Sequence, residues 1–270
     1  MSAVIGWAPL PHVAVGGVRT AVASRAELAA AFIADSRAAQ EAGGSHRSRL
    51  VFDVNGQGLS LAHRDEAFRS ALAAADVVHA DGAPIVAAAR RFAARPIAER
   101  SATTDLYHDL CRAAAEAGQS IYLLGGEERV NAECARRTAA LYPGLHIAGR
   151  RNGFFSGAEE EAVVDEIAGA APDLLFVGIG KPREQQFAAR NADRLGAIWT
   201  VTCGGCFNFV TGDYRRAPQW MQDRGLEWLH RLATRPRQLG WRYLTTSPHA
   251  LWLLWRHRDR SLYDSARMAA

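Results

Sequence analysis

The sequence predicts an α/β fold, in which a mostly parallel β-sheet carries helices on both faces and is followed by a helical C-terminal appendage. Two observations predict it. Short apolar runs alternate with helical stretches rich in Ala, Leu, Arg and Glu, and no strand pattern follows residue 211. The 270 residues, 49% of them hydrophobic, are enough for one large domain with an appendage, or for two small domains.

Six short apolar runs are expected to form the strands of the sheet. They are residues 50–54, 76–80, 120–124, 145–148, 174–178 and 198–202. Most of them lack strict alternation of apolar and polar residues, as strands covered on both faces do. The helices expected between them are residues 62–75, 84–94, 104–117, 129–141, 158–170 and 183–195. This order of elements predicts parallel strands joined by right-handed crossovers.

The two ends of the chain depart from this alternation. Near the N-terminus we expect a hairpin strand at 13–15, a helix at 24–42 and an exposed loop at 43–49. Near the C-terminus we expect two helices, 215–234 and 237–256, divided by a proline. We therefore divide the chain into an α/β domain, a membrane-proximal helical appendage and a tail, at residues 1–211, 212–260 and 261–270.

Charge and hydropathy narrow the class of protein. The net charge is +4 and the pI is about 9.1, and arginines and tryptophans crowd residues 215–260. That combination favours an anionic partner such as phosphate, lipid headgroups or nucleic acid. No nucleic-acid motif occurs, so we expect no nucleic acid to bind. Neither a signal peptide nor a run of 18 apolar residues is present, so any membrane association is expected to be peripheral, from the cytoplasm.

The cysteines and acidic residues do not predict a metal or a cofactor. Cys203 and Cys206 form a C-x-x-C without a second pair, at an expected strand end rather than ahead of a helix. We expect these two, with Cys111 and Cys134, to be reduced and structural. No Asp-x-Asp, which often holds a metal on a sugar nucleotide, occurs in the chain. Neither G-x-G-x-x-G nor a Walker A sequence occurs.

Polar and glycine residues follow every expected strand, and in an open parallel sheet ligands bind beyond the carboxyl ends of the strands. The residues singled out at this edge are Asp53, Asn55, Asp81, Gly125, Gly126, Phe154, Gly180, Glu184 and Asn208. Gly125 and Gly126 either let backbone amides approach a phosphate or form a plain turn. Asp53 and Asn55 either orient a sugar hydroxyl or cap the next helix.

Asp81 has two roles that fit the local pattern equally well. At the end of a strand and before a glycine, it can be the general base that takes a proton from an acceptor hydroxyl during sugar transfer. It can also accept hydrogen bonds from the first amides of the next helix. In the absence of a metal motif, a leaving diphosphate needs arginines, whose planar fork binds phosphate. The candidates are Arg100, Arg216, Arg231, Arg237 and Arg242.

Several of these segments together resemble the WecG/TagA/CpsF family of glycosyltransferases. The resemblance spans residues 50–243 and rests on Asp81-Gly82, on segment 178–185, and most specifically on Arg-Ala-Pro at 216–218, LEWLHRL at 226–232 and Arg-Tyr at 242–243. It implies a Rossmann-like fold and inverting transfer of a sugar, often N-acetylmannosamine, from a UDP donor to a polyprenyl-diphosphate-linked saccharide without a metal. It also implies C-terminal helices that attach to the membrane and supply arginine to the site.

The resemblance assigns roles residue by residue. Asp81 matches the base, Asn55 the asparagine beside it, and Arg231 an arginine that reaches the diphosphate. Arg100 matches an arginine in an R-x-x-G-x-D-L string, and Phe154 an aromatic that stacks on uracil. The departures are Asp53 for a threonine, Thr103 for a glycine, Glu184-Gln185 for Gln-Glu, Asn208 for an aspartate, and Gln238, next to Arg237, for an arginine. They leave the donor sugar open.

The sequence therefore predicts an inverting, metal-independent glycosyltransferase without a cofactor. Its expected partners are a UDP-sugar donor, a lipid-linked saccharide acceptor and an anionic membrane surface, at the inner face of the cell membrane in the synthesis of a surface polysaccharide. The sequence is compatible with an oligomer. The alternative is a catalytically silent member of the same fold that binds a nucleotide or a lipid.

Overall fold

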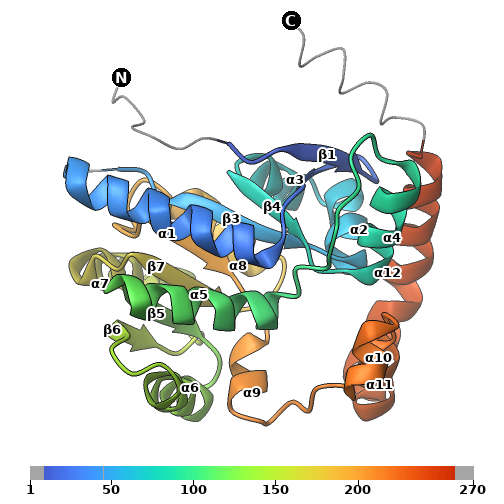
Figure 1. Ribbon diagram of the computed structural model, residues 1–270. Helices are drawn as coiled ribbons and strands as arrows, with labels where there is room; N and C mark the ends of the chain where they lie inside the picture. The colour runs from blue at the N-terminus through green and yellow to red at the C-terminus, as the bar shows by residue number, and fades with distance from the viewer. Residues whose placement is uncertain (1–8, 45, 259–270) are drawn as a thin grey trace, which may run out of the picture.

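The computed structural model describes residues 9–44 and 46–258, and a parallel sheet forms its centre (Figure 1). Its six strands are β3 (Arg49–Val54), β4 (Val77–Ala80), β5 (Ser120–Gly125), β6 (His146–Arg151), β7 (Leu174–Gly178) and β8 (Trp199–Thr202). They lie in the order β4-β3-β8-β7-β5-β6, and every adjacent pair is parallel. All six carboxyl ends therefore meet at one edge, as the apolar runs predicted.

Helices cover both faces of the sheet, so the predicted fold class is confirmed. One face packs against α1 (Arg25–Ala42), α5 (Thr103–Ala117), α6 (Glu128–Leu141) and α9 (Cys206–Val210). The other packs against α2 (Gly56–Arg64), α3 (Glu66–Ala73), α4 (Ala83–Phe92), α7 (Glu160–Ala170) and α8 (Arg183–Asn191). Figure 1 shows α1 and α5 side by side on the first face. The central strands β3 and β7 are buried along their whole length.

The N-terminal hairpin and the first helix follow the prediction. Strands β1 (His12–Val15) and β2 (Val18–Ala21) pair antiparallel across a Gly-Gly turn. Ser24 caps α1 and forms a capping box with Glu27, in which each side chain bonds the other residue's backbone amide. Of the expected exposed loop, residue 45 lies outside the described residues, and Ser48 and Arg49 are buried because β3 begins there.

Three expected helices are wrong in extent. The helix expected at 62–75 is two helices, because Asp65 accepts a hydrogen bond from the Phe68 amide and starts α3 anew. The helix expected at 215–234 is α10 (Gln219–Asp223) and α11 (Glu227–Thr234), separated at Gly225, which has a positive φ of 69°. The helix expected at 183–195 ends at Asn191. The short helices α9 and η1 (Gly157–Glu159) were not expected.

The C-terminal appendage consists of α10, α11 and the long helix α12 (Pro236–Arg256). Figure 1 shows α12 running along one side of the α/β body, with α10 and α11 beyond the carboxyl edge of the sheet. Ala250, Leu253 and Leu254 of α12 are buried in the same apolar cluster as strand β3 and helix α2. The end of α12 is therefore part of the body's core, whereas the expected tail at 261–270 lies outside the described residues.

Candidate functional site

The carboxyl ends of β3, β4 and β7 bring four polar side chains into one hydrogen-bonded group. We name Asp53, Asn55, Asp81 and Lys181 the strand-end cluster. Asn55 is its centre, because its Nδ2 donates to Asp53 Oδ2 and to Asp81 Oδ2, both at 3.1 Å. Its Oδ1 accepts from the Gly58 amide at 3.1 Å and thereby caps α2. Each polar atom of the Asn55 side chain is thus engaged within the protein.

Asp81 is held at both carboxylate oxygens. Oδ2 accepts from Asn55, and Oδ1 accepts from the Thr103 amide at 3.1 Å, at the start of α5. The capping bond therefore goes to α5 and not to the next helix, α4, which begins at Gly82 without a side-chain cap. Burial raises the pKa of Asp81, but Arg231, Arg100 and the Asn55 hydrogen bond together lower it below its ordinary value. The carboxylate is ionised and half-buried.

Lys181 was not among the predicted site residues, and the structure places it against Asp53. Its Nζ lies 2.7 Å from Asp53 Oδ2 and 3.0 Å from the Asp53 carbonyl oxygen. Both side chains are 7% exposed. A buried carboxylate is unfavourable without a partner, so an aspartate at the end of a buried strand was a signal that a cation must lie nearby.

Glu184 lies at the first turn of α8 and bonds two loops of the same edge. Its Oε2 accepts from the amides of Gly180 and Gly204, each at 3.0 Å, and Gln185 donates to its Oε1. The side chain is buried, and burial raises the pKa of Glu184 to about 7, aided by the nearby Asp53 carboxylate. Glu184 therefore connects the loops after β7 and β8, and Gly180 carries one of its bonds.

A second charged group joins the body to the appendage. We name Arg100, Arg216, Arg231 and Glu227 the arginine cluster. Glu227, 4% exposed, lies 2.7 Å from Arg100 Nη2, 2.9 Å from Arg231 Nη2 and 3.7 Å from Arg216 Nε. The arginines overcome the effect of burial and lower the pKa of Glu227. Sequence reasoning did not select Glu227 as a site residue, although arginines that lie close together need an acidic partner or a bound anion.

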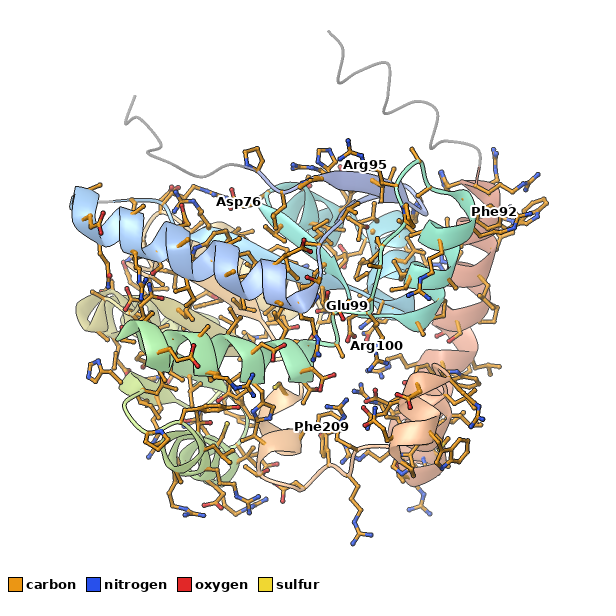
Figure 2. The ribbon with its side chains drawn as sticks, viewed as in Figure 1. Asp76, Phe92, Arg95, Glu99, Arg100 and Phe209 are labelled. Carbon is orange, nitrogen blue, oxygen red and sulfur yellow. The ribbon has the colours of Figure 1, made fainter. Side chains whose placement is uncertain are left out.

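Two further contacts fix the arginine cluster. Arg216 pairs with Asp105 of α5, at 2.7 Å from Nη1 to Oδ1, and the Arg231 guanidinium lies 4.7 Å from the centre of the Phe209 ring. Figure 2 shows Arg100 and Phe209 in the space between the body and helices α10 and α11. Arg231 and Arg100 both act on the pKa of Asp81, so this cluster and the strand-end cluster are neighbours.

The remaining predicted arginines lie elsewhere on the appendage. Arg237 is exposed at the first turn of α12. Arg242 is one turn further along, and its guanidinium lies 5.2 Å from the centre of the Tyr243 ring. The structure thus brings together three of the five predicted arginines around Glu227.

Of the predicted glycines, Gly125 is explained by close packing. A Cβ on Gly125 would lie 2.2 Å from the Gly178 carbonyl oxygen, and the Gly126 amide donates to that same oxygen at 3.1 Å. The Gly126 amide therefore already has an acceptor inside the protein, and contact of either glycine with a phosphate stays a prediction. Phe154 is 75% exposed on the loop after β6, and Asn208 lies in α9, where its carbonyl accepts from the Tyr214 amide.

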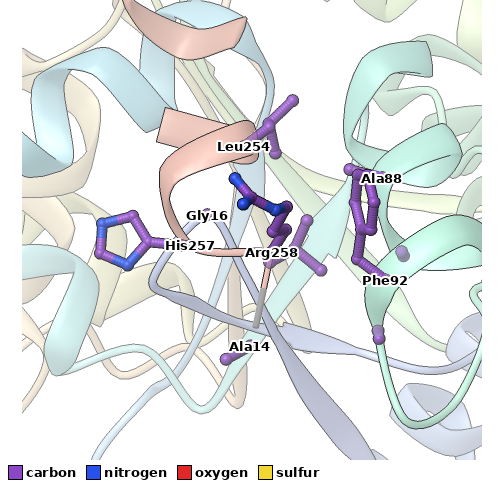
Figure 3. A pocket seen from close by; sticks show the side chains of 10 residues that line it. Ala14, Gly16, Ala88, Phe92, Leu254, His257 and Arg258 are labelled. Carbon is purple, nitrogen blue, oxygen red and sulfur yellow. The ribbon is translucent and has the colours of Figure 1, made fainter. Parts of the chain in front are cut away.

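Two other features of the described residues bear on ligands. Within residues 9–44 and 46–258, no three His, Cys, Asp or Glu side chains are grouped so that they could hold a metal ion. The pocket in Figure 3 lies between β1, α4 and the end of α12, and Ala14, Ala88, Phe92 and Leu254 line part of it. None of the predicted site residues lines this pocket.

The appendage exposes large apolar side chains. They are Trp220, Trp228, Leu229, Trp241, Leu244, Leu251, Trp252 and Trp255. On α12, residues 241, 244, 248, 252 and 255 recur at three- and four-residue spacing, which places them on one face of the helix. The opposite face carries the buried residues that contact the body. Among the helices in the described ranges, none combines the length and apolar character needed to span a bilayer.

Two comparisons with known proteins bear on the family of this chain. The model of the glycosyl transferase WecG/TagA/CpsF family matches residues 13–262 of this chain. A protein of Bacillus spizizenii, N-acetylglucosaminyldiphosphoundecaprenol N-acetyl-beta-D-mannosaminyltransferase, is 29% identical over 194 residues. That similarity covers 72% of this chain and 74% of the Bacillus protein.

Proposed function

The chain belongs to the WecG/TagA/CpsF family of glycosyl transferases, and we propose that it moves a sugar from a UDP donor to a polyprenyl-diphosphate-linked saccharide, with inversion and without a metal ion. One observation carries the proposal. An ionised carboxylate, Asp81, is fixed at both oxygens beside a cluster of three arginines. A base for the acceptor and cations for a diphosphate thus lie side by side.

The proposed reaction is a single displacement at the anomeric carbon. Asp81 accepts the proton of the acceptor hydroxyl, whose oxygen forms a bond to the anomeric carbon from the face opposite the diphosphate. The bond from that carbon to the diphosphate oxygen breaks, and UDP leaves with the electron pair. Attack from the opposite face inverts the configuration. A positioned base accelerates such a step by roughly 10²–10⁴-fold.

The arginines stabilise the charge that develops on the leaving UDP. Arg100, Arg216 and Arg231 present guanidinium groups around Glu227, and a diphosphate is a stronger partner for them than one carboxylate. The same arginines lower the pKa of Asp81. A bound diphosphate compensates their charge and therefore raises the pKa of Asp81. Donor binding thus strengthens the base at the moment it is needed.

The partners follow from the site and the family. The Bacillus relative acts, by its name, on N-acetylglucosaminyl diphosphoundecaprenol, and we propose a lipid-linked saccharide of that class as acceptor. We propose that the donor carries N-acetylmannosamine or another hexose, that Phe154 stacks on its uracil, and that Asn208, Arg237 and Arg242 are further donor contacts. At the sheet edge, the donor is supported by Asn55, Gly125, Gly126, Gly180 and Glu184. The apolar face of α12 docks the enzyme on the inner face of the membrane.

Turnover of defined substrates tests the proposal. The purified chain is incubated with a panel of UDP- and GDP-sugars and a polyprenyl-diphosphate saccharide, with EDTA or with added Mg²⁺, and products are identified by mass spectrometry. We expect one UDP-sugar to be transferred, with inversion, at the same rate in EDTA. Binding of UDP without transfer of any sugar would instead favour a catalytically silent protein. Activity lost in EDTA and restored by Mg²⁺ would refute the metal-independent step.

A further inference from the structure

Within the strand-end cluster, the pair Asp53–Lys181 is buried, charged and not needed for the proposed displacement. Lys181 Nζ bonds both the carboxylate and the carbonyl oxygen of Asp53. Asp53 Oδ2, the atom that receives the ammonium, also receives Asn55 Nδ2. With each side chain 7% exposed, the pair has little access to a ligand. Asp53 instead has a second contact inside the protein, with Asn55, and Asn55 in turn contacts the proposed base Asp81.

The chain of contacts runs from Lys181 to Asp81 without a gap. Lys181 fixes the Asp53 carboxylate at 2.7 Å, and Asp53 receives one Asn55 Nδ2 hydrogen at 3.1 Å. The other Asn55 hydrogen goes to Asp81, also at 3.1 Å. An acceptor in the position of Asp53, together with the Gly58 amide at Oδ1, favours the amide orientation in which the other hydrogen points to Asp81.

We propose that Asp53 and Lys181 are positioning residues, which act through Asn55 to hold Asp81 in the orientation of the base. The role rests on the proposed function, because Asp81 is the base only if the chain transfers a sugar. The positioning role takes the place of the donor contact that was considered for Asp53. It also gives Lys181 a function. Lys181 holds the Asp53 carboxylate in place, and Asn55 transmits that position to Asp81.

The matched test compares two double variants, D53T/K181M and D53V/K181M. Threonine and valine have nearly the same shape, and both variants remove the buried ion pair, so they differ in one acceptor oxygen at position 53. Mutation of Asn55 itself is less clean, because Asn55 also caps α2. We expect kcat of D53V/K181M to be roughly tenfold or more below that of D53T/K181M, with similar KM for the donor.

The pH profile separates positioning from packing. The charged and titratable groups that act on Asp81 are His79, Arg100, Arg216 and Arg231. Those in contact with its neighbours are Asp53, Lys181, Glu184 and Glu227. Charges of these groups are the same in the two double variants, so only the Asn55 hydrogen bond differs. Its loss favours the protonated form of Asp81. The acidic limb of kcat should therefore lie about one pH unit higher in D53V/K181M than in D53T/K181M.

Two outcomes would overturn the proposal, and one measurement tests it without turnover. Equal kcat and equal acidic limbs in the two variants would make the pair a packing feature and overturn the inference. A higher donor KM with unchanged kcat in D53V/K181M would return Asp53 to donor binding and overturn it as well. A ¹³C carboxyl titration of Asp81 in both folded variants reads the same hydrogen bond without turnover. It thus stays informative even if the wild-type chain transfers no sugar and the proposed function fails.

Discussion

The strand-end cluster and the arginine cluster lie side by side but are built differently. All members of the first come from the α/β body, where adjacent parallel strands fix Asp53 and Asp81 relative to each other. The second joins Arg100 of the body to Glu227, Arg216 and Arg231, which come after the last strand. The fold itself therefore positions the proposed base. The cations that we propose for the leaving group come together only when the appendage is docked.

The buried glutamates of the two regions, Glu184 and Glu227, differ in their pKa values. Burial penalises the charged form of both. Glu227 has three arginines around it and its pKa is lowered, whereas Glu184 has mainly backbone amides and Lys181, and its pKa rises to about 7. The arginines around Glu227 outweigh the effect of burial on its pKa, whereas Lys181 does not outweigh that effect at Glu184.

Replacing the base should give the largest effect. In D81N the carboxylate becomes an amide of the same shape that accepts no proton, so we expect kcat to fall roughly 10²–10⁴-fold. Donor binding should change little, because the arginine cluster is intact. Steady-state transfer and UDP titration calorimetry measure the two separately. Wild-type turnover in D81N would remove Asp81 from the mechanism.

Loss of one cation of the appendage should rank second. R231A removes a guanidinium that contacts Glu227 and acts on Asp81, and we expect kcat to fall roughly 10²–10³-fold. Vesicle binding should persist, since one charge near a membrane contributes only about 1 kcal/mol. R224A is the control, an exposed arginine of the same appendage. If R224A and R231A lowered kcat equally, general loss of positive charge would explain both.

The same difference between regions explains what could be predicted from the sequence. All six strands and the polar residues at their ends were predicted. A short apolar run and the residues that directly follow it can be recognised from neighbouring positions in the sequence. Lys181 and Glu227 were missed as partners, since they meet Asp53 and Arg100 across 128 and 127 residues of chain. The breaks at Asp65 and Gly225 were missed because an N-cap aspartate and a left-handed glycine both occur inside a pattern that is otherwise helical.

The buried Glu184 offers a pH-dependent test within the body. Its pKa of about 7 in the folded protein lies above its ordinary value of 4.5. Folding therefore favours the protonated form, and this group's contribution to stability is greatest below pH 4.5 and falls as pH rises to about 7. E184Q retains an acceptor oxygen but cannot ionise. As pH rises from 4.5 to about 7, we expect the free energy of unfolding of E184Q to increase relative to that of wild type by up to about 3 kcal/mol. This is a factor of roughly 100 in the folding equilibrium.

Chemical denaturation of wild type and E184Q at several pH values measures that difference. An exposed glutamate, Glu161, provides the control, because E161Q should leave the pH dependence of unfolding unchanged. A constant difference between E184Q and wild type from pH 4.5 to 7.5 would mean that Glu184 stays ionised in the fold, as Glu227 does.

The smallest expected effect is on membrane binding. We expect the appendage to bind the membrane through residues outside both clusters. Trp241 and Trp255 are 75% and 58% exposed and lie on the outward face of α12. W241A/W255A removes two rings from that face without touching the buried side that packs on the body. We expect binding to vesicles with anionic lipid to weaken roughly tenfold, with unchanged turnover of a water-soluble acceptor. Leu141, 58% exposed at the end of α6, provides the control L141A. If L141A weakened vesicle binding as much, exposed apolar area anywhere on the chain would suffice and the face of α12 would not be the docking surface.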